Sequence, residues 1–202
     1  VLTAGDTVTL SDTTANIAAL TTGAIAALAG ANVDKIDATN DSVSLTLAQF
    51  QALGYRYMVA RGQKGYNGVA ILSKLPIMDA GEQDFAQLGH ARHVAAQLEN
   101  GVTIHNFYVP AGGDIPDRDE NAKFGQKLDY LTEMRDFFHW ERPDRAILVG
   151  DLNIAPRQDD VWDHKALLKI VSHTPVEVEH LGAVMEAGRW QDVTRQDIPE
   201  GR

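Results

Sequence analysis

The chain contains no cysteine among its 202 residues. That absence excludes a disulfide framework and any thiolate metal site, and it fits a reducing compartment, so the cytoplasm is the predicted location. No apolar run approaches the roughly 20 residues that span a bilayer. The N-terminus also lacks a basic region followed by an apolar stretch and a cleavage site. The sequence therefore predicts no membrane segment and shows no visible export signal.

Positive charge is scarce as well. Lys and Arg number 18 against 28 Asp and Glu, which gives a formal net charge of −10. Because phosphate contacts need clustered Lys and Arg, this balance argues against a nonspecific nucleic-acid binder. Residues 1–53 hold a single basic residue, Lys35, so a basic cluster is expected only in residues 54–202. The 44% hydrophobic content is ordinarily globular.

The first 53 residues also lack Glu, Trp, Tyr and Arg, and a normal mixture begins near residue 54. Within them, "DTVTLSDTTANIAAL" and "DSVSLTLAQFQAL" each predict a short strand followed by a helix. This portion resembles the Ala/Asp-rich repeats of large bacterial surface and calcium-associated proteins. Asp34, Asp37 and Asp41 form either a calcium loop or a solvated turn. The turn is favoured because no Asp-x-Asp-x-Asp-Gly spacing appears.

What the second part contains is an alternation of strands with helices or long loops. Strands are predicted for "YRYMVA", "GVAILSK" and "RAILVGD", and two more flank the Asn-Gly turn of "HVAAQLENGVTIHNFYVP". Helical spacing of apolar residues predicts a helix over "KFGQKLDYLTEMRDFFHWE", and "DVWDHKALLKIV" returns to helix. Strands followed by covering helices indicate a layered α/β sandwich.

Polar residues follow three of these strands, in segments 62–74, 106–114 and 148–156. In an α/β sheet the side chains at strand ends converge on one rim, where ligands bind. Tyr108, Asp151 and Asn153 are therefore expected to share a cleft.

Five segments in this part, "KGYNGVAILSK", "FYVPAGGD", "KFGQKLDYL", "LVGDLNIAP" and "DVWDHKALL", closely resemble the exonuclease III family of DNA-repair nucleases, within the endonuclease/exonuclease/phosphatase superfamily. They occur in the family's order and spacing over roughly residues 54–202. The resemblance implies a four-layered α/β fold that hydrolyses DNA phosphodiesters beside abasic sites and at 3′ ends. It implies magnesium or manganese as the metal and double-stranded DNA as the partner, with no obligate protein partner.

The same resemblance assigns roles to individual residues. Asp151 resembles the aspartate that orients or deprotonates the attacking water, and Asn153 the amide that contacts the scissile phosphate. Tyr108 resembles a tyrosine that contacts or polarises that phosphate, and Lys127, one turn after Lys123, resembles a phosphate-contacting lysine. Such donors suit the charge that grows on the nonbridging oxygens during attack at phosphorus.

Each of these residues also has a purely structural interpretation. Asp151 and Asn153 are common turn caps after a strand, Tyr108 suits a half-buried strand position, and Lys123 and Lys127 suit a solvated helix face. The Asp163–His164 pair lies in a segment that predicts a helix start. Its histidine is interpreted as a surface or helix-start residue.

The chain departs from the family pattern at both ends. Complete members carry a metal-holding Glu on an early strand and an Asp-His pair near the end, whereas the first Glu here is Glu82. The expected organisation is a repeat-derived segment over residues 1–53 and an exonuclease III-like domain over residues 54–202 that lacks its first and last strands. The expected fold class is α/β, an incomplete four-layered sandwich with a small α+β N-terminal segment.

Without the family's Glu, Asp151 is left as a possible metal ligand and weak catalysis is expected. Two alternatives stay open. One is a noncatalytic fusion or surface-repeat fragment, and the other is a phosphatase or phospholipid diesterase of the same superfamily.

Overall fold

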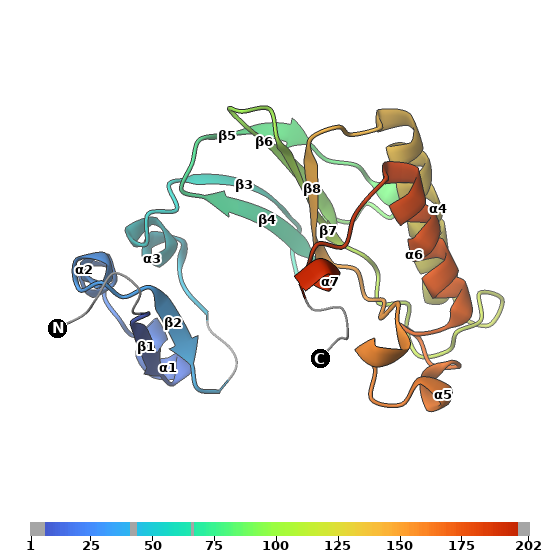
Figure 1. Ribbon diagram of the computed structural model, residues 1–202, viewed down its shortest axis with the longest axis horizontal. Helices are drawn as coiled ribbons and strands as arrows, with labels where there is room; N and C mark the ends of the chain where they lie inside the picture. Colours follow the sequence, from blue (N-terminus) through green and yellow to red (C-terminus); the bar gives the residue numbers. More distant parts are fainter. Residues whose placement is uncertain (1–6, 41–43, 66, 198–202) are drawn as a thin grey trace. The chain divides into compact units, whose positions relative to one another are not determined.

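The computed structural model describes residues 7–40, 44–65 and 67–197 (Figure 1). The chain divides into two compact units, one formed by residues 1–58 with 72–76 and the other by residues 59–71 with 77–202. In the described part of the chain, no helix is long and apolar enough to cross a membrane. The mixture of sheets and helices confirms the predicted α/β class.

The first unit is small and built from short elements. In chain order these are β1 (Thr9–Asp12), α1 (Thr14–Ala18), α2 (Thr22–Gly30), β2 (Lys35–Ala38) and α3 (Leu47–Ala52). β1 and β2 pair in parallel. Each of the three helices starts behind a threonine whose side chain accepts a backbone N–H of the first turn, which satisfies a donor that the helix itself leaves open.

The two strand-helix predictions in this unit differ in outcome. The first is confirmed by β1 and α1. In the second, α3 is present but residues 44–46 form no strand, and residues 41–43 lie outside the described part. Asp34 accepts a hydrogen bond from the Val8 N–H and Asp37 accepts one from the Ser11 hydroxyl, both at 3.0 Å. These carboxylates tie β1 to β2, while Asp41 lies outside the described residues.

The second unit is built around a four-stranded sheet of order β5 (Ile77–Gly81), β6 (His93–Leu98), β7 (Thr103–Tyr108), β8 (Ala146–Asp151). β5, β6 and β7 are antiparallel neighbours, and β8 runs parallel to β7. β3 (Tyr57–Gly62) and β4 (Gly68–Ser73) form a separate two-stranded sheet. All six strands match predicted strands except β5, which the sequence patterns did not indicate.

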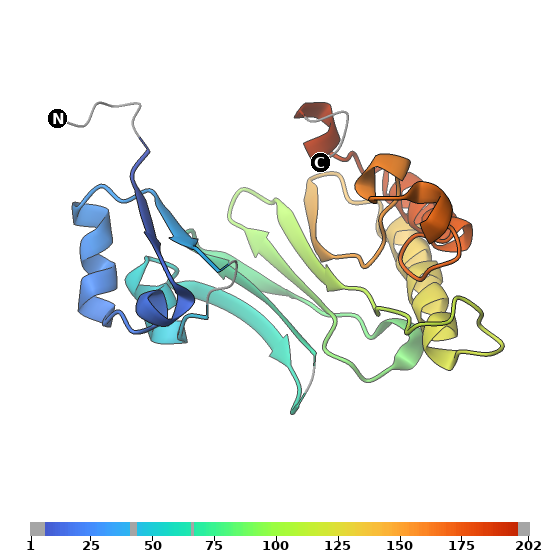
Figure 2. The same cartoon turned by 90° about the horizontal axis from the view of Figure 1, so that it is seen from below.

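Two long helices, α4 (Ala122–Glu141) and α6 (Pro175–Gly188), lie together on one side of the four-stranded sheet (Figures 1 and 2). The shorter helices are η1 (Phe85–Gln87), η2 (Gln158–Asp160), α5 (His164–Leu167) and α7 (Thr194–Asp197). The long helix predicted from the apolar spacing is confirmed as α4. The helix predicted over residues 160–171 is confined to α5, because Asp163 caps its start and the chain after Leu167 forms turns, with the Ile170 N–H bonded to the Leu167 carbonyl.

The sheet buries apolar side chains on both faces. Towards α4 and α6, Phe107 packs with Leu131, Met134, Phe138 and Val184. On the opposite face, side chains of β3 and β4 pack against β6 in a second cluster of Val59, Val69, Ile71, Val94 and Ala96, which Tyr108 borders. Alternation along β7 therefore sends Phe107 to the helix face and Tyr108 to the other face.

Candidate functional site

The ends of β7 and β8 bring two of the predicted site residues side by side. Tyr108 is the register partner of Asp151 across the parallel pair. The following residue, Val109, donates its N–H to the Asp151 carbonyl at 2.9 Å. Tyr108 is half-buried and Asp151 is exposed. The strand ends thus place a phenol and a carboxylate on one rim of the sheet, as the sequence predicts.

A glycine makes this close approach possible. Gly150 has a φ of +124°, and a Cβ at this position would collide with the Phe107 carbonyl oxygen on β7. Only a residue without a side chain fits between the two strands here. β8 therefore stays against β7 up to the residue that carries the exposed carboxylate.

Asp151 and Asn153 form a tight turn directly after β8. The Asn153 N–H donates to Asp151 Oδ1 at 2.9 Å, and Asn153 adopts a left-handed φ of 51° that asparagine tolerates. The Asn153 amide Nδ2 donates to the Val109 carbonyl at 2.9 Å. The turn-cap interpretation is therefore correct, but the hydrogen bonds of the turn occupy only one carboxylate oxygen of Asp151 and one amide N–H of Asn153. Each side chain retains polar capacity for a ligand.

Tyr108 is positioned by Arg92 on the neighbouring chain segment. The Arg92 guanidinium lies over the Tyr108 ring, 4.7 Å from the ring centroid, and its Nη1 donates to the Tyr108 carbonyl at 3.0 Å. The Tyr108 N–H donates in return to the Arg92 carbonyl at 2.8 Å. A cation over a tyrosine ring is an attractive contact that orients both groups.

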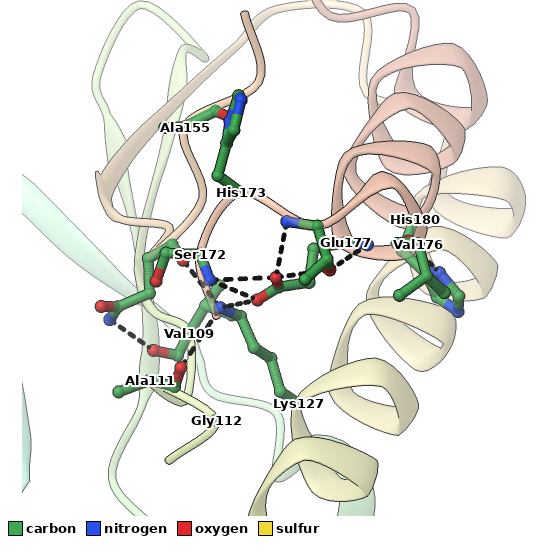
Figure 3. A network of polar contacts seen from close by, with 12 residues as sticks. Val109, Ala111, Gly112, Lys127, Ala155, Ser172, His173, Val176, Glu177 and His180 are labelled. Carbon is green, nitrogen blue, oxygen red and sulfur yellow. Dashed lines mark hydrogen bonds and ion pairs between the residues drawn. The ribbon is translucent and has the colours of Figure 1, made fainter. Parts of the chain in front are cut away.

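Lys127 lies in the interior and not on the helix surface (Figure 3). Its side chain has 0% exposure. The ammonium donates to the carbonyls of Ala111 at 3.3 Å and Asn153 at 2.7 Å, and to the Glu177 carboxylate at 2.5 Å. An ammonium has three N–H donors, so these contacts use all of them. The structure does not place Lys127 where it can contact a phosphate, contrary to the expectation.

Glu177 is the partner that the sequence patterns missed. Its carboxylate also accepts hydrogen bonds from the backbone N–H groups of Ser172 and Thr174 and from the Thr174 hydroxyl. Burial lowers the pKa of Lys127, and the facing Glu177 carboxylate opposes that shift. The spacing Thr-x-x-Glu is a helix-start signal that predicts part of this arrangement. Nothing local, however, joins it to a lysine fifty positions earlier.

The remaining predicted residues lie apart from this turn. Lys123 is exposed at the first turn of α4. Asp163 caps α5 by accepting the Ala166 N–H at 3.0 Å, which confirms the helix-start interpretation of the Asp163–His164 pair. His164 Nδ1 lies 2.8 Å from His173 Nε2, and His173 Nδ1 donates to the Ala155 carbonyl at 2.7 Å.

Comparison with known proteins places this arrangement in a family. A model described as the endonuclease/exonuclease/phosphatase family matches residues 19–196. The chain belongs to this family. The match begins inside the segment predicted to be repeat-derived, so the boundary at residue 54 stays a prediction.

Comparison with individual proteins gives the same result. Exodeoxyribonuclease III of Haemophilus influenzae is 28% identical over 116 residues, which are 54% of this chain and 42% of the relative. A 3′-5′ exonuclease of Neisseria meningitidis is 29% identical, with a TM-score of 0.65 over 76% of this chain and 59% of that one. An AP endonuclease of Archaeoglobus fulgidus shares the fold, with 24% identity and a TM-score of 0.71 over 96% of this chain and 75% of that one. The chain thus spans less than two thirds of the exonuclease relatives.

The side chains at this turn do not form a complete set of metal ligands by themselves. Among residues 7–40, 44–65 and 67–197, no group of three or more His, Cys, Asp or Glu side chains is placed to hold an ion. Mg²⁺ is commonly bound through one or two carboxylates together with waters and substrate phosphates. The exposed Asp151 carboxylate, beside the Asn153 amide, fits that minimal mode and no tighter one.

Proposed function

We propose that this chain is an exodeoxyribonuclease III-like phosphodiesterase that hydrolyses DNA beside abasic sites and at 3′ ends. The observation that carries the proposal is the juxtaposition of Tyr108, Asp151 and Asn153 at the ends of β7 and β8. Family membership supports a hydrolytic reaction at phosphorus. The names of the Haemophilus and Neisseria relatives support DNA as the substrate class.

The chemistry of each of the three side chains suits a different role in phosphodiester hydrolysis. Asp151 is the one anionic group of the three, so it orients or deprotonates the attacking water and must be ionised to do so. The second N–H of the Asn153 amide and the Tyr108 hydroxyl are donors for the phosphate oxygens, where charge develops during attack. The bond from the Asn153 amide to the Val109 carbonyl orients the first donor before the substrate arrives. The Arg92 guanidinium over the Tyr108 ring orients the second.

Magnesium or manganese is the proposed metal. Asp151 would hold it, and the metal would supply charge neutralisation at the phosphate. Since this site offers few carboxylates, we expect weak metal binding in the absence of DNA. Lys123, exposed at the start of α4, is proposed as a contact to a backbone phosphate of double-stranded DNA.

The test is incision of a duplex that carries an abasic-site analogue, with magnesium and then manganese. Metal-dependent incision that Asp151→Asn abolishes supports the proposal. Asp129→Asn, at an exposed carboxylate on α4 that pairs with Arg118, is the matched control and should retain the activity. Lys123→Ala should weaken DNA binding and reduce the slope of log affinity against log salt by about one. Absence of incision with every duplex and both metals would refute the catalytic proposal for this chain.

A noncatalytic role is the second candidate. It is favoured by the donor set, because the described residues form no cluster of three potential ligands. It predicts neither incision nor a change in melting temperature on adding magnesium. A rise of several degrees with magnesium that Asp151→Asn removes would count against it.

A further inference from the structure

Lys127 ties together the two segments that follow β7 and β8. The strand pairing ends at Tyr108 and Asp151. Beyond that point, the Lys127 ammonium donates to the Ala111 carbonyl on one segment and to the Asn153 carbonyl on the other (Figure 3). A single side chain from α4 therefore links the two segments that carry the candidate site.

The packing around Lys127 is close. Gly112 has a φ of +93°, and a Cβ at this position would lie 3.0 Å from Lys127 Cδ. The backbone of the first segment lies against the lysine side chain because residue 112 is a glycine. The ammonium is enclosed together with the Glu177 carboxylate, and both side chains have 0% exposure. This packing fixes the position of the ammonium between its two carbonyl acceptors.

Stability alone does not account for an ion pair at this place. Replacing a buried ion pair by apolar side chains of similar volume is often neutral or stabilising, because both charges must otherwise be removed from water. An apolar side chain at position 127, however, could not donate to the carbonyls of Ala111 and Asn153. The feature that distinguishes Lys127 from an apolar residue is therefore its set of donors, and these act on the segments of the site.

Asn153 depends on one of these donors. Its N–H is bonded to Asp151 Oδ1 and its carbonyl to Lys127, so both of its backbone groups are held. A non-glycine residue with a left-handed φ keeps that conformation only where its surroundings hold it. Loss of the Lys127 contact frees the carbonyl. The residue can then leave the conformation in which its side-chain amide bonds to the Val109 carbonyl.

We propose that Lys127 is a positioning residue for phosphodiester hydrolysis. It holds the Asn153 amide in the orientation that contacts the scissile phosphate, and Glu177 is the counterion that keeps the ammonium in the interior. This inference rests on the proposed function, because it explains how one of the phosphate donors is oriented. All three donors of the ammonium are used inside the protein. Lys127 therefore acts through Asn153 and not on the substrate.

The kinetic test compares two variants whose stability and activity should rank in opposite order. Glu177→Gln leaves an unpaired charge but keeps the lysine donors, whereas the double variant with Lys127→Met leaves no unpaired charge but removes these donors. With the abasic-site duplex, kcat of the double variant should fall about tenfold or more and KM should stay within about threefold, because the lost contact acts in the transition state. Glu177→Gln should lose less of its kcat although it melts at a lower temperature.

The stability-matched control is Leu181→Ala. Leu181 is buried on α6, one turn after Glu177. Its truncation leaves a cavity that lowers the melting temperature, and kcat below that temperature should stay within about twofold of that of the unmodified chain. If kcat instead follows the melting temperature across the three variants, with the double variant at least as active as Glu177→Gln, the pair is only structural and the proposal is wrong.

A second measurement does not depend on activity. Nitrogen-15 relaxation gives the order parameter of the Asn153 side-chain amide, which should be near the rigid value of about 0.85 in the unmodified chain and below about 0.6 in the double variant. The Val109 N–H, bonded to the Asp151 carbonyl, reports the strand pairing and should stay rigid in both proteins. An Asn153 amide that remains rigid in the double variant, or a Val109 N–H that loosens equally, overturns the proposal. Absence of incision by the unmodified chain would refute the proposed function alone, since the order parameters still decide the role of Lys127.

Discussion

The buried ion pair between α4 and α6 allows a sharp prediction. Glu177→Gln removes the negative charge but keeps a side chain that still suits the third position of a helix start. Lys127 would then retain its ammonium at 0% exposure with only neutral oxygens as acceptors, the carbonyls of Ala111 and Asn153 and the new side-chain amide. Breaking a buried pair from one side leaves an uncompensated charge in the interior, which costs about 3 to 5 kcal/mol.

The loss should be visible as a lower melting temperature. For a chain of about this size, 1 kcal/mol corresponds to roughly 2 to 4 °C, so Glu177→Gln should melt about 6 to 20 °C lower. Lys127→Met should cost a comparable amount, because it leaves the carboxylate unpaired. The double variant should lose less than the sum of the two, since neither charge is then left alone. Urea unfolding of the four proteins measures this cycle.

The pH dependence gives a further check on the cause. Glu177 raises the pKa of Lys127 against the lowering effect of burial, so its removal lowers that pKa further. The unfolded chain then binds more protons than the folded one as pH rises through the lysine range, and the stability of Glu177→Gln increases with pH. Three results would refute this account. The first is a free energy of unfolding of Glu177→Gln within about 0.5 kcal/mol of that of the unmodified chain. The others are additive losses in the double-mutant cycle and a stability of Glu177→Gln that does not increase at high pH.

Two other predictions concern the sheet. Gly150→Ala should destabilise the protein by at least about 2 kcal/mol in urea unfolding, because its Cβ meets the Phe107 carbonyl at a positive φ. Burial lowers the pKa of His93 to about 3, with His105 as a second cause, and lowers that of His105 to about 4, against an ordinary 6.5. Between these pKa values the unfolded chain binds more protons than the folded chain. The free energy of unfolding therefore falls as pH drops from about 6.5 towards 4, by roughly 3 kcal/mol per histidine. His93→Phe should reduce this loss, whereas His139→Gln, at an exposed position, should not.

Local patterns predicted most elements of the second unit and fewer of the first. The alternation and the Asn-Gly turn around residues 93–110 gave β6 and β7, and apolar spacing gave α4. Failures occurred where tertiary contacts decide. β5 was not predicted because its side chains are mostly exposed and show little alternation between buried and exposed positions. The helix expected over residues 160–171 is confined to α5, because Asp163 caps its start and residues 168–173 form turns that lead to Glu177.

The two lysines on α4 show the same limit within the site. Lys123 and Lys127 are one turn apart, so the sequence treats them alike, as neighbours on one helix face. The structure separates them, with Lys123 exposed and Lys127 enclosed beneath the strand ends. The difference arises from Glu177, whose position opposite α4 follows from the packing of α6. Pairing across fifty residues leaves no periodic trace in the sequence.

This buried pair has a consequence for the strand-end residues. Lys127 holds a carbonyl of the segment after β7, at Ala111, and one of the turn after β8, at Asn153. Asp151 in turn caps the N–H of Asn153. The Lys127 ammonium also attracts the Asp151 carboxylate, so the helix acts on this turn through two backbone carbonyls and through charge. Loss of the pair should therefore loosen the Asn153 turn while leaving the β7–β8 register intact, because that register depends on the strand bonds and on Gly150.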